Sequence, residues 1–132
     1  MPTVNQHLAK VRSNKKLLHH FGDVSSTEFP DWYVTATFYT ALHCIEAILC
    51  QEIQYHSKGH EDREIFLRTR LPAVDRSFLN AYRELYTKSR EARYMTNKKF
   101  NMDEADCKFA LENLAIIETE CKETYFPNYP NP

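Results

Sequence analysis

Apolar residues recur at spacings of three and four along most of the chain, which is the pattern of amphipathic helices. The clearest case begins near Pro30, a residue that helices tolerate in their first turn. One continuous apolar face follows it, formed by Val34, Phe38, Ala41, Leu42, Ile45, Ile48 and Leu49. We therefore expect a long helix here, at the centre of the hydrophobic core.

Four further helical stretches are predicted around this segment. A weak stripe through Leu8, Val11 and Leu18 indicates a first helix over residues 5–21, and Gly22 ends it. A short helix is expected at residues 61–70, and a longer one at 74–94. Asn101 and Glu104 resemble a capping box that opens the last helix. The predicted fold class is all-α.

A single domain is expected over residues 1–132, without internal repeats. Only two glycines occur, and a sandwich or barrel of short strands would need more of them in its turns. Residues 96–102 are predicted to form a basic, polar turn. The proline-rich tail, residues 125–132, is expected to be a frayed or draped end without helix.

Charge and cysteine usage are typical of a cytoplasmic protein. The net charge of −1 argues against coating nucleic acid through bulk positive charge. The polar N-terminus lacks the apolar segment of a secretory signal. Residues 32–50 are the one membrane candidate, but they contain His43 and Glu46, so we expect a buried core helix and no membrane span. The four cysteines are interpreted as buried reduced thiols.

Reactive side chains are densest at residues 56–63, which include His56, His60 and Arg63. Histidine changes charge near neutral pH and arginine grips phosphate, so a phosphate site could form here. The alternative is an ordinary helix start, where acidic residues suit the helix dipole. No metal site is expected, because His56 and His60 flank Gly59 in a predicted loop and do not share a helix face.

A second cluster lies at the end of the fourth predicted helix. Tyr86, Arg90 and Tyr94 share one helix face, so the arginine could hold a phosphate while a base stacks on a tyrosine. Lys98 and Lys99 extend its positive charge. The alternative is a cationic helix end that complements the dipole.

Polar residues also interrupt the apolar central helix. Tyr39, His43 and Glu46 are expected to meet partners from another helix, because an unpaired buried polar group is costly. Arg63 and Arg90 are the natural candidates. His43 is interpreted either as a structural hydrogen-bonded histidine or as a general acid or base.

Taken together, these segments resemble the HEPN superfamily of small helical domains. The resemblance lies in the aromatic-rich segment at residues 31–46, the loop at 57–63 and the stretch from Leu85 to Tyr94, which carries Arg90. It implies a bundle of four long helices plus one short helix, and a homodimer. Many members of the family are metal-independent ribonucleases.

In those ribonucleases about four to six residues separate an Arg from a His; the Arg stabilises phosphate charge and the His transfers protons. This chain lacks that signature, since no His follows Arg90 or Arg93. The only pair with this spacing is Arg12 and His19, but they lie in the first helix, where the family signature does not normally lie, and we treat the match as coincidence.

Three functions follow. The first is a nucleotide- or RNA-binding regulatory domain of a toxin–antitoxin or phage-defence system, with a partner protein encoded nearby and Arg63, Arg90 and Tyr94 as ligand contacts. The second is a ribonuclease with a noncanonical site built on His43 and His60. The third is a structural helical dimer with an internal polar network of Tyr39, Glu46 and Tyr86. No cofactor is expected.

Overall fold

Five α-helices make up most of the described chain, which covers residues 1–94 and 101–132 of a computed structural model. They are α1 (Val4–His20), α2 (Pro30–Ile53), α3 (His60–Thr69), α4 (Arg76–Tyr94) and α5 (Glu104–Glu120), and a π-helical turn (Cys121–Tyr125) continues α5. No described residue lies in a β-strand, so the all-α prediction is confirmed. Most of the predicted basic turn, with Lys98 and Lys99, falls outside the described residues.

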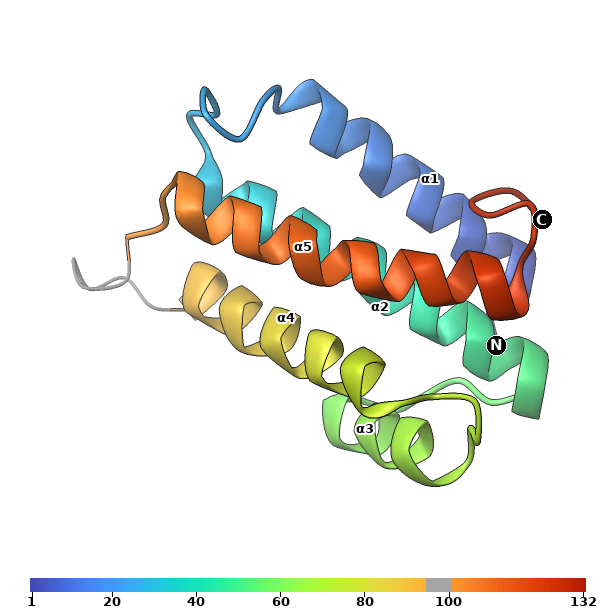
Figure 1. The fold of residues 1–132 in the computed structure, drawn as a ribbon. Helices are drawn as coiled ribbons and strands as arrows, with labels where there is room; N and C mark the ends of the chain where they lie inside the picture. The colour runs from blue at the N-terminus through green and yellow to red at the C-terminus, as the bar shows by residue number, and fades with distance from the viewer. Residues whose placement is uncertain (95–100) are drawn as a thin grey trace.

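Helix α2 runs through the middle of the molecule, and the other long helices flank it (Figure 1). α1, α4 and α5 each pack along α2, and α4 also packs against α5. The short helix α3 packs against α4. Both chain ends lie at the same end of the molecule (Figure 1). The predicted central position of the second helix is confirmed.

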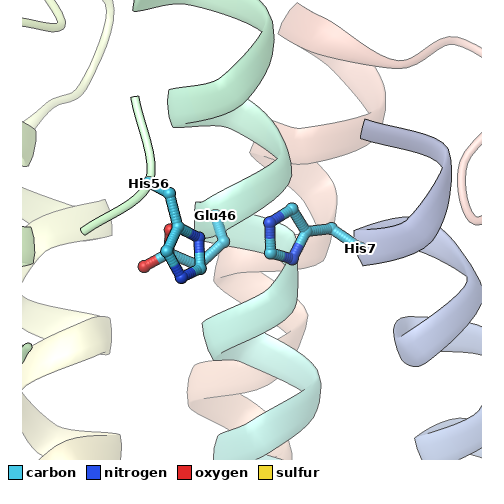
Figure 2. Close-up of side chains that lie close together, drawn as sticks. All are labelled: His7, Glu46 and His56. Carbon is cyan, nitrogen blue, oxygen red and sulfur yellow. The ribbon is translucent and has the colours of Figure 1, made fainter. Parts of the chain in front are cut away.

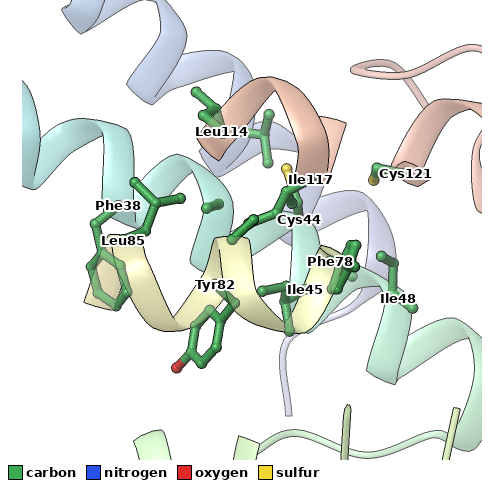
Figure 3. Packing of buried hydrophobic residues seen from close by; sticks show 14 of the residues in the cluster. Phe38, Cys44, Ile45, Ile48, Phe78, Tyr82, Leu85, Leu114, Ile117 and Cys121 are labelled. Atoms are coloured by element: carbon green, nitrogen blue, oxygen red, sulfur yellow. The ribbon is translucent and has the colours of Figure 1, made fainter. Parts of the chain in front are cut away.

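The core is built from the inward faces of these helices (Figure 3). Every position of the predicted apolar face of α2 is buried except Leu42, which is half-buried. These side chains pack against α4 and α5 through Phe78, Tyr82, Leu85, Leu114 and Ile117. The periodicity therefore located the core correctly.

Buried threonines in α2 satisfy their own hydroxyl groups. Thr35, Thr37 and Thr40 each donate to the carbonyl oxygen four residues earlier, at 2.7 to 2.8 Å. By length and composition α2 could cross a membrane, but 78% of its apolar window is buried inside the protein. That burial favours the predicted core helix over a membrane span.

The capping box of α5 differs from the predicted one. Asp103, not Asn101, is the N-cap, and its carboxylate accepts from the Asp106 amide at 3.1 Å. The Asp106 carboxylate accepts in return from the Asp103 amide at 3.0 Å. The Asn101–Glu104 assignment was therefore wrong by two residues, because two overlapping pairs have the same spacing of three and Asp serves both positions.

The C-terminal tail lies folded against the bundle. Phe126 is buried, the Arg12 guanidinium donates to the Pro130 carbonyl at 3.0 Å, and the Tyr129 hydroxyl donates to Glu118. It is therefore a draped end, fixed to α1 and α5. The predicted tail began one residue too early, because Tyr125 still belongs to the π-helical turn.

The four cysteines are free thiols. Cys44, Cys107 and Cys121 are buried, as predicted, whereas Cys50 is half-buried. Burial raises the pKa of the Cys107 thiol to about 11. At neutral pH this thiol is therefore protonated and unreactive.

Removing the α5 cap should cost stability. We expect Asp103→Ala to lower the free energy of unfolding by about 1 kcal/mol, because the Asp106 amide loses its acceptor. Asn101→Ala should change it by less than about 0.5 kcal/mol. Urea unfolding of the two variants checks this, and a larger loss for Asn101→Ala would contradict the observed cap.

Candidate functional site

Glu46 of α2 is a carboxylate with only 1% of its surface exposed. Its Oε1 accepts from Arg63 Nε at 2.8 Å and from the Ser57 hydroxyl. Its Oε2 accepts from the Ser57 amide at 3.2 Å and lies 3.3 Å from His56 Nδ1. A buried charge is tolerated only when it is paired and hydrogen-bonded, and Glu46 is both. The predicted contact between Glu46 and Arg63 is confirmed.

Arg63 extends this hydrogen-bond network from Glu46 of α2 to Tyr82 of α4. His60 and Arg63 share the inward face of α3, since they are three residues apart. Arg63 Nη1 donates to the Tyr82 hydroxyl at 2.9 Å, and His60 Nδ1 lies 2.8 Å from the same oxygen. The His60 ring stacks on Tyr86, with centroids 3.3 Å apart and planes at 4°. One chain of contacts therefore joins α2, α3 and α4.

Both ring nitrogens of His60 have partners. Nδ1 contacts Tyr82, and Nε2 lies 3.4 Å from the Glu64 carboxylate. Burial lowers the pKa of His60, which favours the neutral ring at pH 7. His60 therefore belongs to the same network of polar contacts as Arg63 and Tyr82.

Three histidines gather on the other side of Glu46. His7 of α1 stacks on His56, with ring centroids 5.5 Å apart and planes at 14°. His7 Nδ1 lies 3.1 Å from His43 Nδ1, while His7 Nε2 is buried and has no hydrogen-bond partner among the described residues. One donor atom each from His7, Glu46 and His56 lies within 4.8 Å of the others, as Figure 2 illustrates. Such a set could hold a metal ion.

His43 faces a groove between α1 and α2. The groove encloses about 540 Å³ and is lined by Gln6, His7, Lys10, Ser13 and His43, among others. Burial, and then the neighbouring His7, lower the pKa of His43 to about 4, so the ring is neutral at pH 7. The expectation that His43 meets a partner from another helix is confirmed by its contact with His7 of α1, and the ring is half-buried at the groove.

A further cluster, the arginine–tyrosine surface, comprises Tyr39, Tyr86, Arg90, Arg93 and Tyr94. Arg93 Nη1 donates to the Tyr39 hydroxyl at 3.2 Å, and its guanidinium lies 5.0 Å from the Tyr94 ring centroid. Arg90 Nη1 donates to the Tyr86 hydroxyl at 3.3 Å. Tyr94 is 64% exposed. Within residues 1–94 and 101–132, neither arginine forms an ion pair.

The structure brings some of the predicted site residues together and separates others. His60, Arg63 and Arg90 are connected through the tyrosines of α4. His43 belongs to the histidine cluster, and its described hydrogen bond goes to His7 and not to His60. The two proposed catalytic histidines thus have different partners on opposite sides of Glu46.

Several site residues were missed by sequence reasoning. His7 lies on the same stripe of α1 as Leu8 and Val11, a helical spacing that could have revealed its inward position. Tyr82 is a second such residue, because its buried hydroxyl accepts a hydrogen bond from Arg63. Arg93, not Arg63 or Arg90, is the partner of Tyr39.

Breaking the buried pair should be far more costly than breaking a surface pair. Arg63→Ala leaves the Glu46 carboxylate without its cation, so we expect a loss of about 3–5 kcal/mol. The matched control is Arg83→Ala, whose pair with Glu64 is 43% exposed on the arginine side and should be worth at most about 1 kcal/mol. Equal losses in urea unfolding would contradict the assigned role of Glu46.

Acid should weaken the fold through His43. Since its pKa is 6.5 in the unfolded chain and about 4 in the fold, the stabilisation is present above pH 6.5 and is lost as the pH falls towards 4. The largest stabilisation that this pKa shift allows is roughly 3 kcal/mol, and partial solvent exposure of the His43 ring reduces it. His43→Gln should flatten the pH dependence of the unfolding free energy across this window, and His20→Gln, an exposed control, should not.

No family model matches this chain, and neither does any curated protein or solved structure. What the protein does is therefore inferred from the network around Glu46, the groove between α1 and α2 that His43 faces, and the arginine–tyrosine surface.

Proposed function

We propose that this chain is a HEPN-like regulatory domain that binds RNA or a nucleotide through the arginine–tyrosine surface. The observation that carries the proposal is a pair of guanidinium groups, on Arg90 and Arg93, without a carboxylate partner among the described residues. The nearest acid along the helix, Glu91, instead pairs with Lys88 at 3.4 Å. Neither charge is therefore neutralised within the described ranges, and Arg93 donates only to uncharged acceptors, among them the backbone and hydroxyl oxygens of Ser89 and the Tyr39 hydroxyl.

The tyrosines supply stacking faces beside these charges. Tyr94 is 64% and Tyr39 is 36% exposed. Arg90 lies 6.0 Å from the Tyr94 ring, within the range of a cation–π contact. Alternating cations and aromatic rings are the usual means of holding single-stranded nucleic acid, in which phosphates meet cations and bases stack.

Arg63 is not part of the proposed contact surface. It is 8% exposed, and its charge is paired with the buried Glu46 carboxylate. Arg93 takes its place beside Arg90 and Tyr94. The proposal thus changes one of the three ligand residues expected from the sequence.

The proposal includes a homodimer and a cytoplasmic location, with a toxin–antitoxin or phage-defence role and a partner protein encoded nearby. A metal-independent ribonuclease is the alternative. Incubation with a single-stranded RNA distinguishes the two functions, because only a ribonuclease shortens the RNA. A structural dimer is the third candidate function. In that case the chain does not bind RNA, and Arg90→Ala lowers only the free energy of unfolding.

Fluorescence anisotropy with a labelled single-stranded RNA tests the proposal. We expect Arg90→Ala and Arg93→Ala each to weaken binding about tenfold, because each removes a phosphate contact worth about 1–2 kcal/mol. The slope of log affinity against log salt should fall by about 0.7 per arginine removed. Arg90 is exposed, so the unfolding free energy of Arg90→Ala should stay within about 0.5 kcal/mol of the parent.

Arg76→Ala is the matched control, since it removes an exposed arginine from the opposite end of α4. Its RNA affinity should equal that of the unsubstituted chain. The proposal fails if the chain does not bind RNA, or if Arg76→Ala weakens binding as much as Arg90→Ala does.

A further inference from the structure

We propose that His7, Glu46 and His56 form a binding site for one divalent transition-metal ion, with Zn²⁺ as the best match. The three side chains come from α1, α2 and the connection between α2 and α3. Figure 2 shows them facing one another. This inference does not depend on RNA binding, which is assigned to another surface.

The donor set fits zinc. Two imidazoles and one carboxylate are a familiar three-ligand set for this ion, with water in the fourth position. His56 is 42% exposed, so an ion can approach from solvent on that side. Calcium and magnesium prefer oxygen ligands and fit the set poorly.

His7 is held in the orientation that a ligand needs. It is 2% exposed, and in the part of the chain that the structure describes its Nε2 has no hydrogen-bond partner, although a buried polar atom normally has one. Its other nitrogen, Nδ1, is 3.1 Å from His43 Nδ1. When the Nδ1–H of His7 donates a hydrogen bond to His43, the lone pair of His7 is on Nε2, on the side of the ring that faces the cluster.

Glu46 is oriented in the same manner. Arg63 and the Ser57 hydroxyl occupy its Oε1, while Oε2 is the oxygen beside His56. Hydrogen-bonded carboxylates of this kind are usual metal ligands, because their partners fix the oxygen that binds. The positive charge of Arg63 opposes a cation, and its bond to the other oxygen keeps it on the far side of the carboxylate.

The distances require only a small closure. Bonds of about 2.0–2.1 Å place the ligand atoms of a tetrahedral ion about 3.3 Å apart. His56 Nδ1 and Glu46 Oε2 are 3.3 Å apart, and all three donor atoms lie within 4.8 Å of one another. A movement of about 1–2 Å by His7 or His56 completes the set. A bound ion would tie α1 to the α2–α3 connection.

Calorimetric titration of the full-length, tag-free, chelator-treated chain with ZnCl₂ tests the site. We expect one ion per chain and a rise in Tm on binding, because the ion binds only the folded arrangement. His56→Ala should weaken binding at least about tenfold while its metal-free Tm stays near that of the parent, since the ring is half exposed. His7→Gln is the second variant and should also weaken binding.

His20→Ala, an exposed histidine on the same helix as His7, is the matched control and should bind as the parent does. Co²⁺ should give visible d–d bands without a thiolate charge-transfer band, because no cysteine is among the ligands. The site is refuted if binding does not saturate, if His56→Ala binds as tightly as the parent, if His20→Ala loses affinity equally, or if the cobalt spectrum shows sulfur ligation.

Discussion

The pairing of the buried Glu46 carboxylate with Arg63 is the interaction that organises one end of this molecule. Placing a charge on an apolar core helix is costly unless every lone pair meets a donor. Arg63 joins α3 to α2 through its hydrogen bond with this carboxylate, and Ser57 joins the α2–α3 connection to the same carboxylate. With only 10 residues, α3 is too short to be stable alone, so its position depends on these contacts together with its apolar face.

The same network supports two surfaces of different character. On one side of Glu46, His7 stacks on His56 and, together with His43, lines the groove between α1 and α2. On the other side, contacts pass through Tyr82 and His60 to Tyr86, which carries Arg90 at the arginine–tyrosine surface. Polar groups that are fixed by packing hold their geometry better than groups on free loops, and this makes both surfaces suitable for binding.

Periodicity located the helices and the core because burial imposes a strict spacing on apolar residues. The contact between Glu46 and Arg63 was also foreseeable, since a carboxylate inside an apolar helix demands a cation. The spacing could not say which histidine would meet His43, because His7 lies 36 positions away and the contact depends on how α1 packs. For the same reason, the sequence could not show that Arg93 lies at the arginine–tyrosine surface in place of Arg63. Which arginine is buried depends on the tertiary arrangement.

A double-mutant cycle on Glu46 and Arg63 tests the central claim most directly. Urea unfolding would compare Glu46→Gln, Arg63→Met and the double variant with the parent chain. If the buried pair organises this region, Arg63→Met is strongly destabilising, and adding Glu46→Gln restores part of the loss by removing the unpaired charge, with a coupling of about 1–3 kcal/mol. Additive losses would show that the two groups act independently and would contradict the account.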